Sequence, residues 1–272
     1  MVGSEGTLVG KQSRAQNGVR LKTIALPAEH GGWGLLFEPI ALGLLVAPSI
    51  AGLYLALSAV GFFLARHPLT LVVLNRKRSS PRTALARRFA MLYLAIGIAS
   101  FSAALVFTQH QFMLPLLIAT PFALVQVAHD WTGRRRVLLS ELAGAIAISS
   151  LAPAIALSGD GSAKASLVLW AIMIARVVPA VLYVRACLGR RRVSDASPAP
   201  MIVAHILAIV AAIVFAIANA ASPWVVVALI LLMIRAVVGF AKARTVTAKQ
   251  LGFSEIAFGA MTVIIVAASN YF

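Results

Sequence analysis

The densest group of residues that could do chemistry lies between Pro27 and Gly34, in the sequence PAEHGGWG. Glu29 and His30 are an adjacent acid and base, and such a pair could move a proton to or from a bound group. The three glycines that follow permit close approach of the backbone to a ligand. One histidine and one glutamate are too few for a metal site, so we expect none. The alternative is that Trp33 anchors the start of a helix at a membrane interface.

Two basic segments could bind an anion, because the guanidinium fork of arginine matches the oxygens of a phosphate. In the loop predicted at 66–88, the residues expected to bind a phosphate or diphosphate are Arg66, His67, Asn75, Arg76, Arg78 and Arg82. The second segment, 129–136, adds Asp130, a rare acid that could neutralise an arginine or hold a cation. The alternative for both segments is that their charge only orients the chain in a membrane.

Four ionisable residues lie inside apolar segments: Glu38, Glu141, Arg176 and Arg235. Charged side chains in a membrane interior are costly and mark functional sites by default. Tyr183 lies on the same helix face as Arg176, and a cation and a phenol on one face could line a cavity. The residues of this group expected to bind a ligand are Trp33, Glu38, Arg176, Tyr183 and Arg235. The alternative is an internal ion pair of Arg176 or Arg235 with Glu38 or Glu141.

The composition indicates which elements must position these residues. Of the 272 residues, 61% are apolar and only 12% are charged, whereas soluble domains average about 45–50% and about 25%. We therefore predict an all-α fold, a polytopic transmembrane helical bundle. Nine apolar segments approach the roughly 20 residues that cross a bilayer: 33–48, 50–65, 89–107, 112–128, 138–157, 166–187, 200–219, 224–241 and 255–270. Only Pro48 and Ser49 separate the first two, so a re-entrant hairpin over 33–65 is an alternative.

The distribution of positive charge orients the predicted spans. The loops at 66–88, 129–137, 188–199 and 242–254 hold every basic loop residue except Lys164, and such loops face the cytoplasm by the positive-inside rule. This places the amino terminus in the cytoplasm and the carboxyl terminus outside. Residues 1–22 lack the apolar core of a signal peptide and are predicted to be a disordered tail, followed by one transmembrane domain over 23–272. The net charge of +16 then reflects topology, and we expect the lipid bilayer and no nucleic acid as a partner.

Two segments carry a family resemblance, Glu29–Pro39 (EHGGWGLLFEP) and Phe63–Pro68 (FLARHP). On these segments the chain resembles the YwiC-like family of bacterial membrane proteins, from about residue 22 onward. The resemblance implies a multi-pass protein of the bacterial inner membrane, and it implies no particular reaction or cofactor.

The nine-span arrangement is also similar, more weakly, to that of the UbiA-type intramembrane prenyltransferases. That similarity implies an isoprenoid phosphate as a candidate partner. Those enzymes bind an isoprenoid diphosphate through magnesium, which two aspartate-rich motifs hold. Here the loop at 66–88 has no acidic residue and the loop at 188–199 has only Asp195. The aspartate-rich motifs are therefore absent, and arginine would have to replace the metal as counter-charge of the phosphate.

These features support three hypotheses. The preferred one is a cytoplasm-facing polar pocket for an anionic lipid headgroup, in which arginines hold the anion. In an enzymatic version, Glu29 or His30 moves a proton. The second is a transporter of a small solute or ion that uses the buried charges as counter-ions. The third is a non-catalytic structural membrane protein whose buried charges pair only with one another. The sequence leaves open whether the protein is an enzyme.

Overall fold

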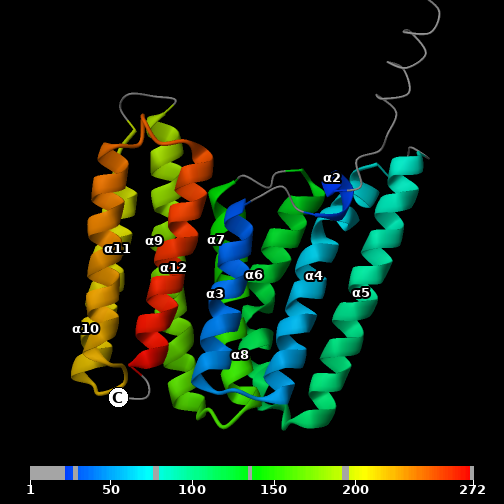
Figure 1. Cartoon of the computed structure of the whole chain (residues 1–272), viewed down its shortest axis with the longest axis horizontal. Helices are drawn as coiled ribbons and strands as arrows, with labels where there is room; N and C mark the ends of the chain where they lie inside the picture. The colour runs from blue at the N-terminus through cyan, green and yellow to red at the C-terminus, as the bar shows by residue number, and fades with distance from the viewer. Residues whose placement is uncertain (1–21, 27–29, 76–79, 134–136, 192–195, 270–272) are drawn as a thin grey trace, which may run out of the picture.

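The structure is a computed structural model, and it describes residues 22–26, 30–75, 80–133, 137–191 and 196–269. Within these ranges every regular element is a helix, which confirms the all-α prediction. Figure 1 shows the long helices side by side in one slab. The elements are α2 (Lys22–Ala25), α3 (His30–Val46), α4 (Ile50–Leu74), α5 (Pro81–Phe107), η1 (His110–Phe112), α6 (Met113–Trp131), α7 (Leu138–Ser149), α8 (Leu151–Ser158), α9 (Ala163–Arg190), α10 (Ala199–Ile217), α11 (Pro223–Ala241) and α12 (Ala248–Ala268).

The helices agree with the predicted number of spans. Across the described ranges, eight helical segments are long and apolar enough to cross a membrane, and a shorter apolar helix covers Gly32–Val46. These nine match the predicted segments one for one, so the chain is a multi-pass membrane protein. α3 and α4 are two separate helices joined by a short turn. The 17 residues of α3 make it about 26 Å long, which is near the lower limit for a span.

The predicted loop at 66–88 is largely helical instead. α4 continues to Leu74 and α5 begins at Pro81, so Arg66 lies in α4 and Arg82 in α5. Ser80 caps α5 by accepting a hydrogen bond from the Thr83 backbone N–H, and a proline follows at the first helical position. Both features favour a helix start. The polar composition of this segment predicted a loop. Its basic residues instead lie in parts of α4 and α5 that continue beyond the apolar parts of these helices.

α7 and α8 form one span that is interrupted at Ser149 and Ser150. Pro153 has no backbone N–H to donate to the Ser149 carbonyl, which breaks the helical hydrogen-bond pattern. The two serine hydroxyls each donate to a carbonyl three residues earlier at 2.7 Å. The indole N–H of Trp170 donates to the Ser149 hydroxyl at 3.0 Å. These side-chain bonds stabilise the interruption at the centre of the bundle, where α8 is almost wholly buried.

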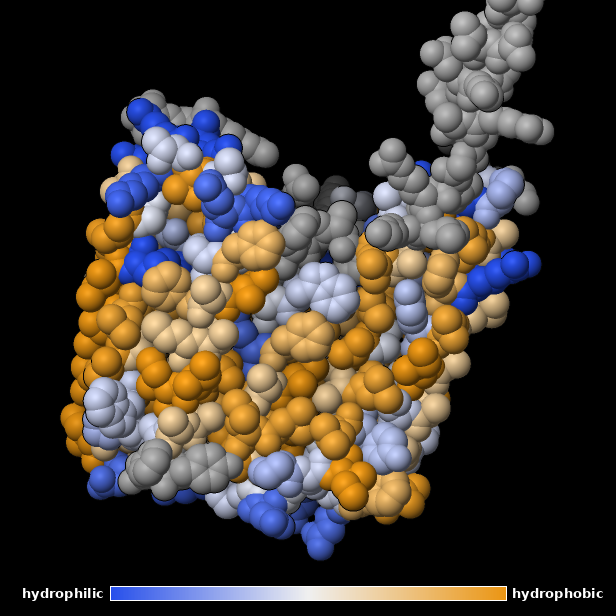
Figure 2. Space-filling model, viewed as in Figure 1, coloured by the Kyte–Doolittle hydropathy of each residue, from blue (hydrophilic) through white to orange (hydrophobic). Residues whose placement is uncertain are grey.

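α3 and α8 connect two apolar cores. One core joins them to α7 and to α9–α12, and the other joins them to α4, α5 and η1. The outer faces of α5, α6, α10 and α11 instead expose large apolar side chains such as Val106, Leu117, Leu207 and Ile234. Figure 2 shows a broad apolar band across the face of the bundle that it displays. A hydrocarbon environment accommodates such a surface, whereas patches of this extent are rare on soluble monomers.

The two ends of the bundle differ in charge. Figure 1 places the start of α3 at one end, together with the α4–α5, α6–α7, α9–α10 and α11–α12 connections. We call this the basic end, because the predicted basic loops lie there. The end of α12 lies at the opposite end. That the basic end faces the cytoplasm stays a prediction, and the predicted tail lies outside the described residues except for Lys22.

Candidate functional site: an intramembrane charge network and a pocket at the basic end

Four charged side chains from four helices meet inside the bundle: Glu38 of α3, Arg176 of α9, Arg235 of α11 and Glu255 of α12. We call them the charge network. Arg176 Nη2 donates to Glu38 Oε1 at 3.1 Å and to the backbone oxygen of Glu255 at 3.1 Å. Arg176 Nη1 lies 3.5 Å from Glu255 Oε2, and Arg235 Nη1 pairs with Glu255 Oε1. Glu255 therefore bridges two arginines, and the formal charges of the network cancel.

Aromatic rings and a glycine complete the surroundings of the network. The Arg235 guanidinium lies 4.3 Å from the ring centroid of Tyr183 and 5.2 Å from that of Phe258, in cation–π geometry. Gly259 leaves the space that Glu38 occupies, because a Cβ at that position would overlap Glu38 Oε1. The helix face that Arg176 shares with Tyr183 thus holds the charge network.

Burial makes this pairing energetically important. The exposed fractions of the four side chains run from 2% for Arg176 to 12% for Glu255, and a buried charge is tolerated only when it is paired. Glu38 Oε2 and the Nε atoms of both arginines have no hydrogen-bond partner among the described residues. The Arg176–Glu38 contact agrees with the predicted alternative of an internal ion pair.

Glu141 lies apart from the network and pairs with Arg185 of α9. Arg185 Nη1 donates to Glu141 Oε2 at 2.9 Å, and the two side chains are 39% and 31% exposed. Of the ion pairs that the sequence offered as an alternative, the structure therefore has Arg176 with Glu38 and not a pair of Glu141 with Arg176 or Arg235. Glu141 lies in the first turn of α7, near the basic end, where a half-exposed pair costs far less desolvation than the buried network does.

A second buried carboxylate, Asp130 of α6, holds Arg66 of α4. Arg66 Nη2 donates to Asp130 Oδ1 at 2.9 Å while Arg66 Nε donates to Oδ2, so the contact is bidentate. With its amide oxygen turned toward the guanidinium, Gln126 accepts from both Arg66 Nη atoms at 3.2 Å. Asp130 is 2% exposed. It therefore neutralises an arginine, one of the two roles that the sequence left open.

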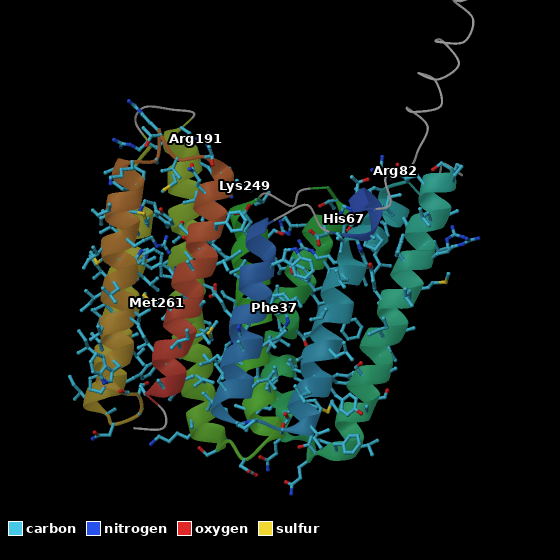
Figure 3. All side chains as sticks on the ribbon, viewed as in Figure 1. Phe37, His67, Arg82, Arg191, Lys249 and Met261 are labelled. Atoms are coloured by element: carbon cyan, nitrogen blue, oxygen red, sulfur yellow. The ribbon has the colours of Figure 1, made fainter. Side chains whose placement is uncertain are left out.

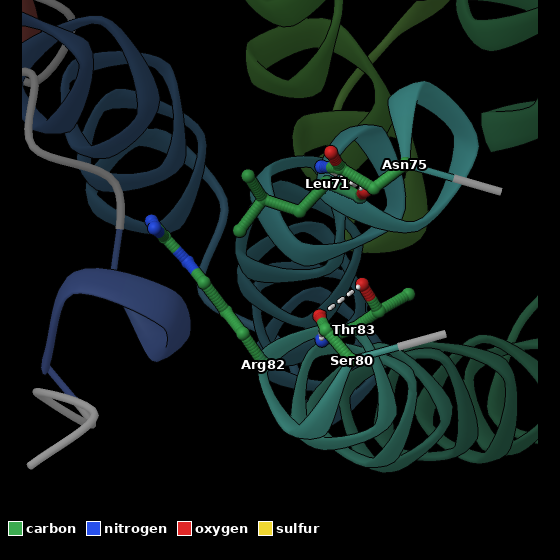
Figure 4. Close-up of a pocket in the computed structure, with 5 residues that line it drawn as sticks. All are labelled: Leu71, Asn75, Ser80, Arg82 and Thr83. Carbon is green, nitrogen blue, oxygen red and sulfur yellow. Dashed lines mark hydrogen bonds between the residues drawn. The ribbon is translucent and has the colours of Figure 1, made fainter. Parts of the chain in front are cut away.

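Two of the predicted phosphate-binding residues, Asn75 and Arg82, line a cavity between the ends of α4 and α5. The cavity has a volume of about 310 Å³ and is lined by Leu71, Asn75, Ser80, Arg82 and Thr83. We call it the α4–α5 pocket. Figure 4 shows Leu71 and Asn75 on α4, and Arg82 extending from the start of α5 toward the side of α2 and α3. The hydroxyls of Ser80 and Thr83 lie 3.0 Å apart, and Asn75 Nδ2 donates to the Leu71 carbonyl at 2.9 Å.

The other predicted site residues are dispersed. His67 Nε2 lies 3.1 Å from the carbonyl oxygen of Thr23 in α2, and Figure 3 shows His67 at the basic end with Arg82. Trp33 packs against Phe37 and Phe63, with ring centroids 5.8 and 5.2 Å away. Glu29, Arg76 and Arg78 lie outside the described residues. Of His30 the structure describes only the backbone, as the first residue of α3.

Sequence reasoning did not identify Glu255 as a site residue. It placed Glu255 at the first position of the last apolar segment, where a polar side chain needs no explanation. α12 in fact begins at Ala248, so Glu255 lies two turns inside the helix. A usable signal existed, because Glu255 is the last of only eight acidic residues and the nearby Arg235 needed a counter-charge.

Comparison with known proteins gives one family match, over part of the chain. No curated protein and no solved structure matches the chain. The family described as YwiC-like protein matches residues 26–156, a range that extends from before α3 into α8. It includes Glu38, Asp130 and the α4–α5 pocket, whereas the network residues of α9, α11 and α12 lie beyond it. Over residues 26–156 the chain thus matches the YwiC-like family, which confirms the resemblance carried by Glu29–Pro39 and Phe63–Pro68.

Proposed function

We propose that the α4–α5 pocket binds the phosphate headgroup of an anionic lipid, from the end of the bundle predicted to face the cytoplasm. The proposal rests on a difference among the arginines that were predicted to bind the ligand: whether each one has a carboxylate partner. Arg66, Arg176 and Arg235 each have a carboxylate partner. Arg82 lines the pocket and forms no salt bridge with any residue in the described ranges. Its guanidinium can therefore donate two parallel hydrogen bonds to a phosphate.

The uncharged groups of the pocket suit the same ligand. One of the Ser80 and Thr83 hydroxyls donates to the other, which leaves one O–H to donate to a ligand. The first turn of the 27-residue helix α5 presents the positive end of the helix dipole. The volume of about 310 Å³ is at the lower end of ligand sites, roughly 300–1,000 Å³. It fits a headgroup better than a whole lipid. The exposed side chain of Leu74 would lie toward the acyl chains.

Several parts of the proposal stay predictions from the sequence. Arg76 and Arg78 would add positive charge beside the pocket. The headgroup carries a phosphate or a diphosphate, and an isoprenoid phosphate is one candidate lipid. Location in the bacterial inner membrane belongs to the same proposal. Binding alone is proposed, without a reaction step.

Native mass spectrometry of the purified protein with added phosphatidic acid tests the proposal. We expect Arg82→Gln to weaken binding about tenfold, because hydrogen bonds to charged groups contribute about 1.5–3 kcal/mol. Arg88→Gln is the matched control: it removes the same charge from an exposed position of α5 that does not line the pocket. Equal binding by wild type and Arg82→Gln, or equal weakening in both variants, would overturn the assignment.

A further inference from the structure

A second concentration of positive charge lies at the basic end, on helices distant in sequence from the α4–α5 pocket. It consists of Arg190, Arg191, Lys242, Arg244 and Lys249, at the end of α9, the end of α11 and the start of α12. We call this group the cationic patch. Figure 3 shows Arg191 and Lys249 at this end, and Figure 2 shows the hydrophilic surface there above the apolar band.

In the part of the chain that the structure describes, the charges of the patch have no carboxylate partner. No described acidic side chain forms a salt bridge with any of the five residues. Of the described acids, Glu141 pairs with Arg185 and Glu255 belongs to the charge network. The side chain of Arg190 is partly enclosed by the protein. Its Nε is buried and has no hydrogen-bond partner in the described ranges. The patch is therefore a concentration of positive charge without a carboxylate partner among the described side chains.

Aromatic rings hold two of these cations at the boundary between polar and apolar surface. Arg190 Cζ lies 4.6 Å from the ring centroid of Phe240, and Lys249 Nζ lies 5.8 Å from that of Phe253. Phe253 is 52% exposed and Val238 of α11 is 49% exposed, so apolar surface begins directly beside the charges. A cation whose stem follows apolar surface is the geometry of side chains at a membrane interface.

The length of α9 places the patch at the level of lipid headgroups. Its 28 residues span about 42 Å, against a hydrocarbon thickness of about 30 Å. The ends of α9 therefore extend beyond the hydrocarbon. Figure 1 shows the ends of α9, α11 and α12 extending farther than the start of α3 at this side of the bundle.

We infer that the cationic patch binds the headgroups of anionic phospholipids, with their acyl chains along the apolar sides of α11 and α12. The free charges supply attraction for a phosphodiester, and the adjoining exposed apolar side chains distinguish a lipid from a soluble polyanion. This site uses other helices than the α4–α5 pocket and does not rest on the function proposed for that pocket.

Native mass spectrometry of the full chain with added phosphatidylglycerol, and with phosphatidylcholine as the uncharged reference, tests the inference. Each basic residue near anionic lipid contributes about a fivefold factor in binding. We therefore expect Arg190→Gln/Lys249→Gln to weaken phosphatidylglycerol binding by more than tenfold. Because Arg190 is partly buried, the exposed pair Arg191→Gln/Lys242→Gln provides a second variant that leaves the packing intact, with the same direction expected.

The control removes an equal charge elsewhere. Arg87→Gln/Arg88→Gln alters two exposed arginines of α5, and we expect its phosphatidylglycerol binding to remain that of wild type. Equal weakening in the patch and control variants would show only a dependence on net charge and would overturn the inference, as would unchanged binding in both patch variants. The pocket is tested by Arg82→Gln and the patch by its own two double variants. Either set can weaken lipid binding while the other leaves it unchanged, so the two proposals can fail separately.

Discussion

The charge network places four ionised side chains where water is largely excluded, and their mutual pairing stabilises them there. Each carboxylate contacts at least one arginine, and Glu255 contacts both. Removing one member leaves an uncompensated buried charge, which costs about 3–5 kcal/mol in comparable cases. At the residue scale, this pairing favours a structural role for Glu38, Arg176 and Arg235 over direct contact with a lipid phosphate.

Glu38→Gln tests that role. It leaves two arginines facing Glu255 alone, so we expect the free energy of unfolding to fall by about 3 kcal/mol. Glu141→Gln breaks a half-exposed ion pair and should cost less than about 1 kcal/mol. Thermal unfolding in one detergent compares the two variants. If Glu38→Gln unfolds at the same temperature as Glu141→Gln, the network does not stabilise the bundle.

At the scale of elements, α4 and α5 approach each other closely through small residues. A Cβ on Gly61 of α4 would lie 2.8 Å from the backbone N and 2.9 Å from the Cα of Gly97 in α5. Ser58 Oγ donates to the Gly97 carbonyl at 2.9 Å. Small residues that permit backbone approach are the usual means of helix association in membranes. This contact fixes the separation of the two helices whose ends form the α4–α5 pocket.

Gly61→Ala should force α4 and α5 apart, because the obstructing atoms belong to the backbone and cannot rotate away. We expect a loss of about 1–3 kcal/mol in the free energy of unfolding, as for other overpacked contacts. The matched control is Gly189→Ala in α9, where a Cβ would meet its nearest neighbour at an ordinary 3.6 Å. Thermal unfolding should rank Gly61→Ala well below Gly189→Ala. Equal stability of the two variants would contradict the close-contact interpretation.

The sequence predicted the number and order of the helical spans better than the residues at which each helix begins and ends. Nine apolar segments were recognisable because a bilayer requires continuous apolar stretches. The extent of α4 and α5 was missed, because basic residues such as Arg66 and Arg82 interrupt hydropathy without interrupting a helix. The interruption at Ser149 and Ser150 was also missed, since Pro153 lies within an otherwise continuous apolar run.

The contacts between spans were less accessible to sequence reasoning. Glu38, Arg176 and Arg235 were recognisable as costly charges, but one sequence contains no information on which helices are neighbours. The structure supplies the neighbour relations that pair Arg176 with Glu38 and Arg66 with Asp130. The same relations separate Arg82 from the other predicted arginines, and no pattern in the sequence distinguished it.

At the scale of the whole molecule, the buried ion pairs form two groups, one on each side of the bundle. The charge network links α3 to α9, α11 and α12, while Arg66 and Asp130 link α4 to α6. The α4–α5 pocket and the cationic patch both lie at the basic end, one on each side. Apolar packing around α3 and α8 joins the two sides. The two proposals therefore concern two separate surfaces of the basic end.

The α4–α5 pocket is proposed to hold a phosphate headgroup. A phosphatidic acid with a photoreactive group near its glycerol, in lipid nanodiscs containing the protein, tests it most directly. We predict cross-links, mapped by peptide mass spectrometry, concentrated between Leu71 and Thr83 and depleted in Arg82→Gln but not in Arg88→Gln. Cross-links spread evenly over all helix ends at the basic end, or unchanged in Arg82→Gln, would contradict the account.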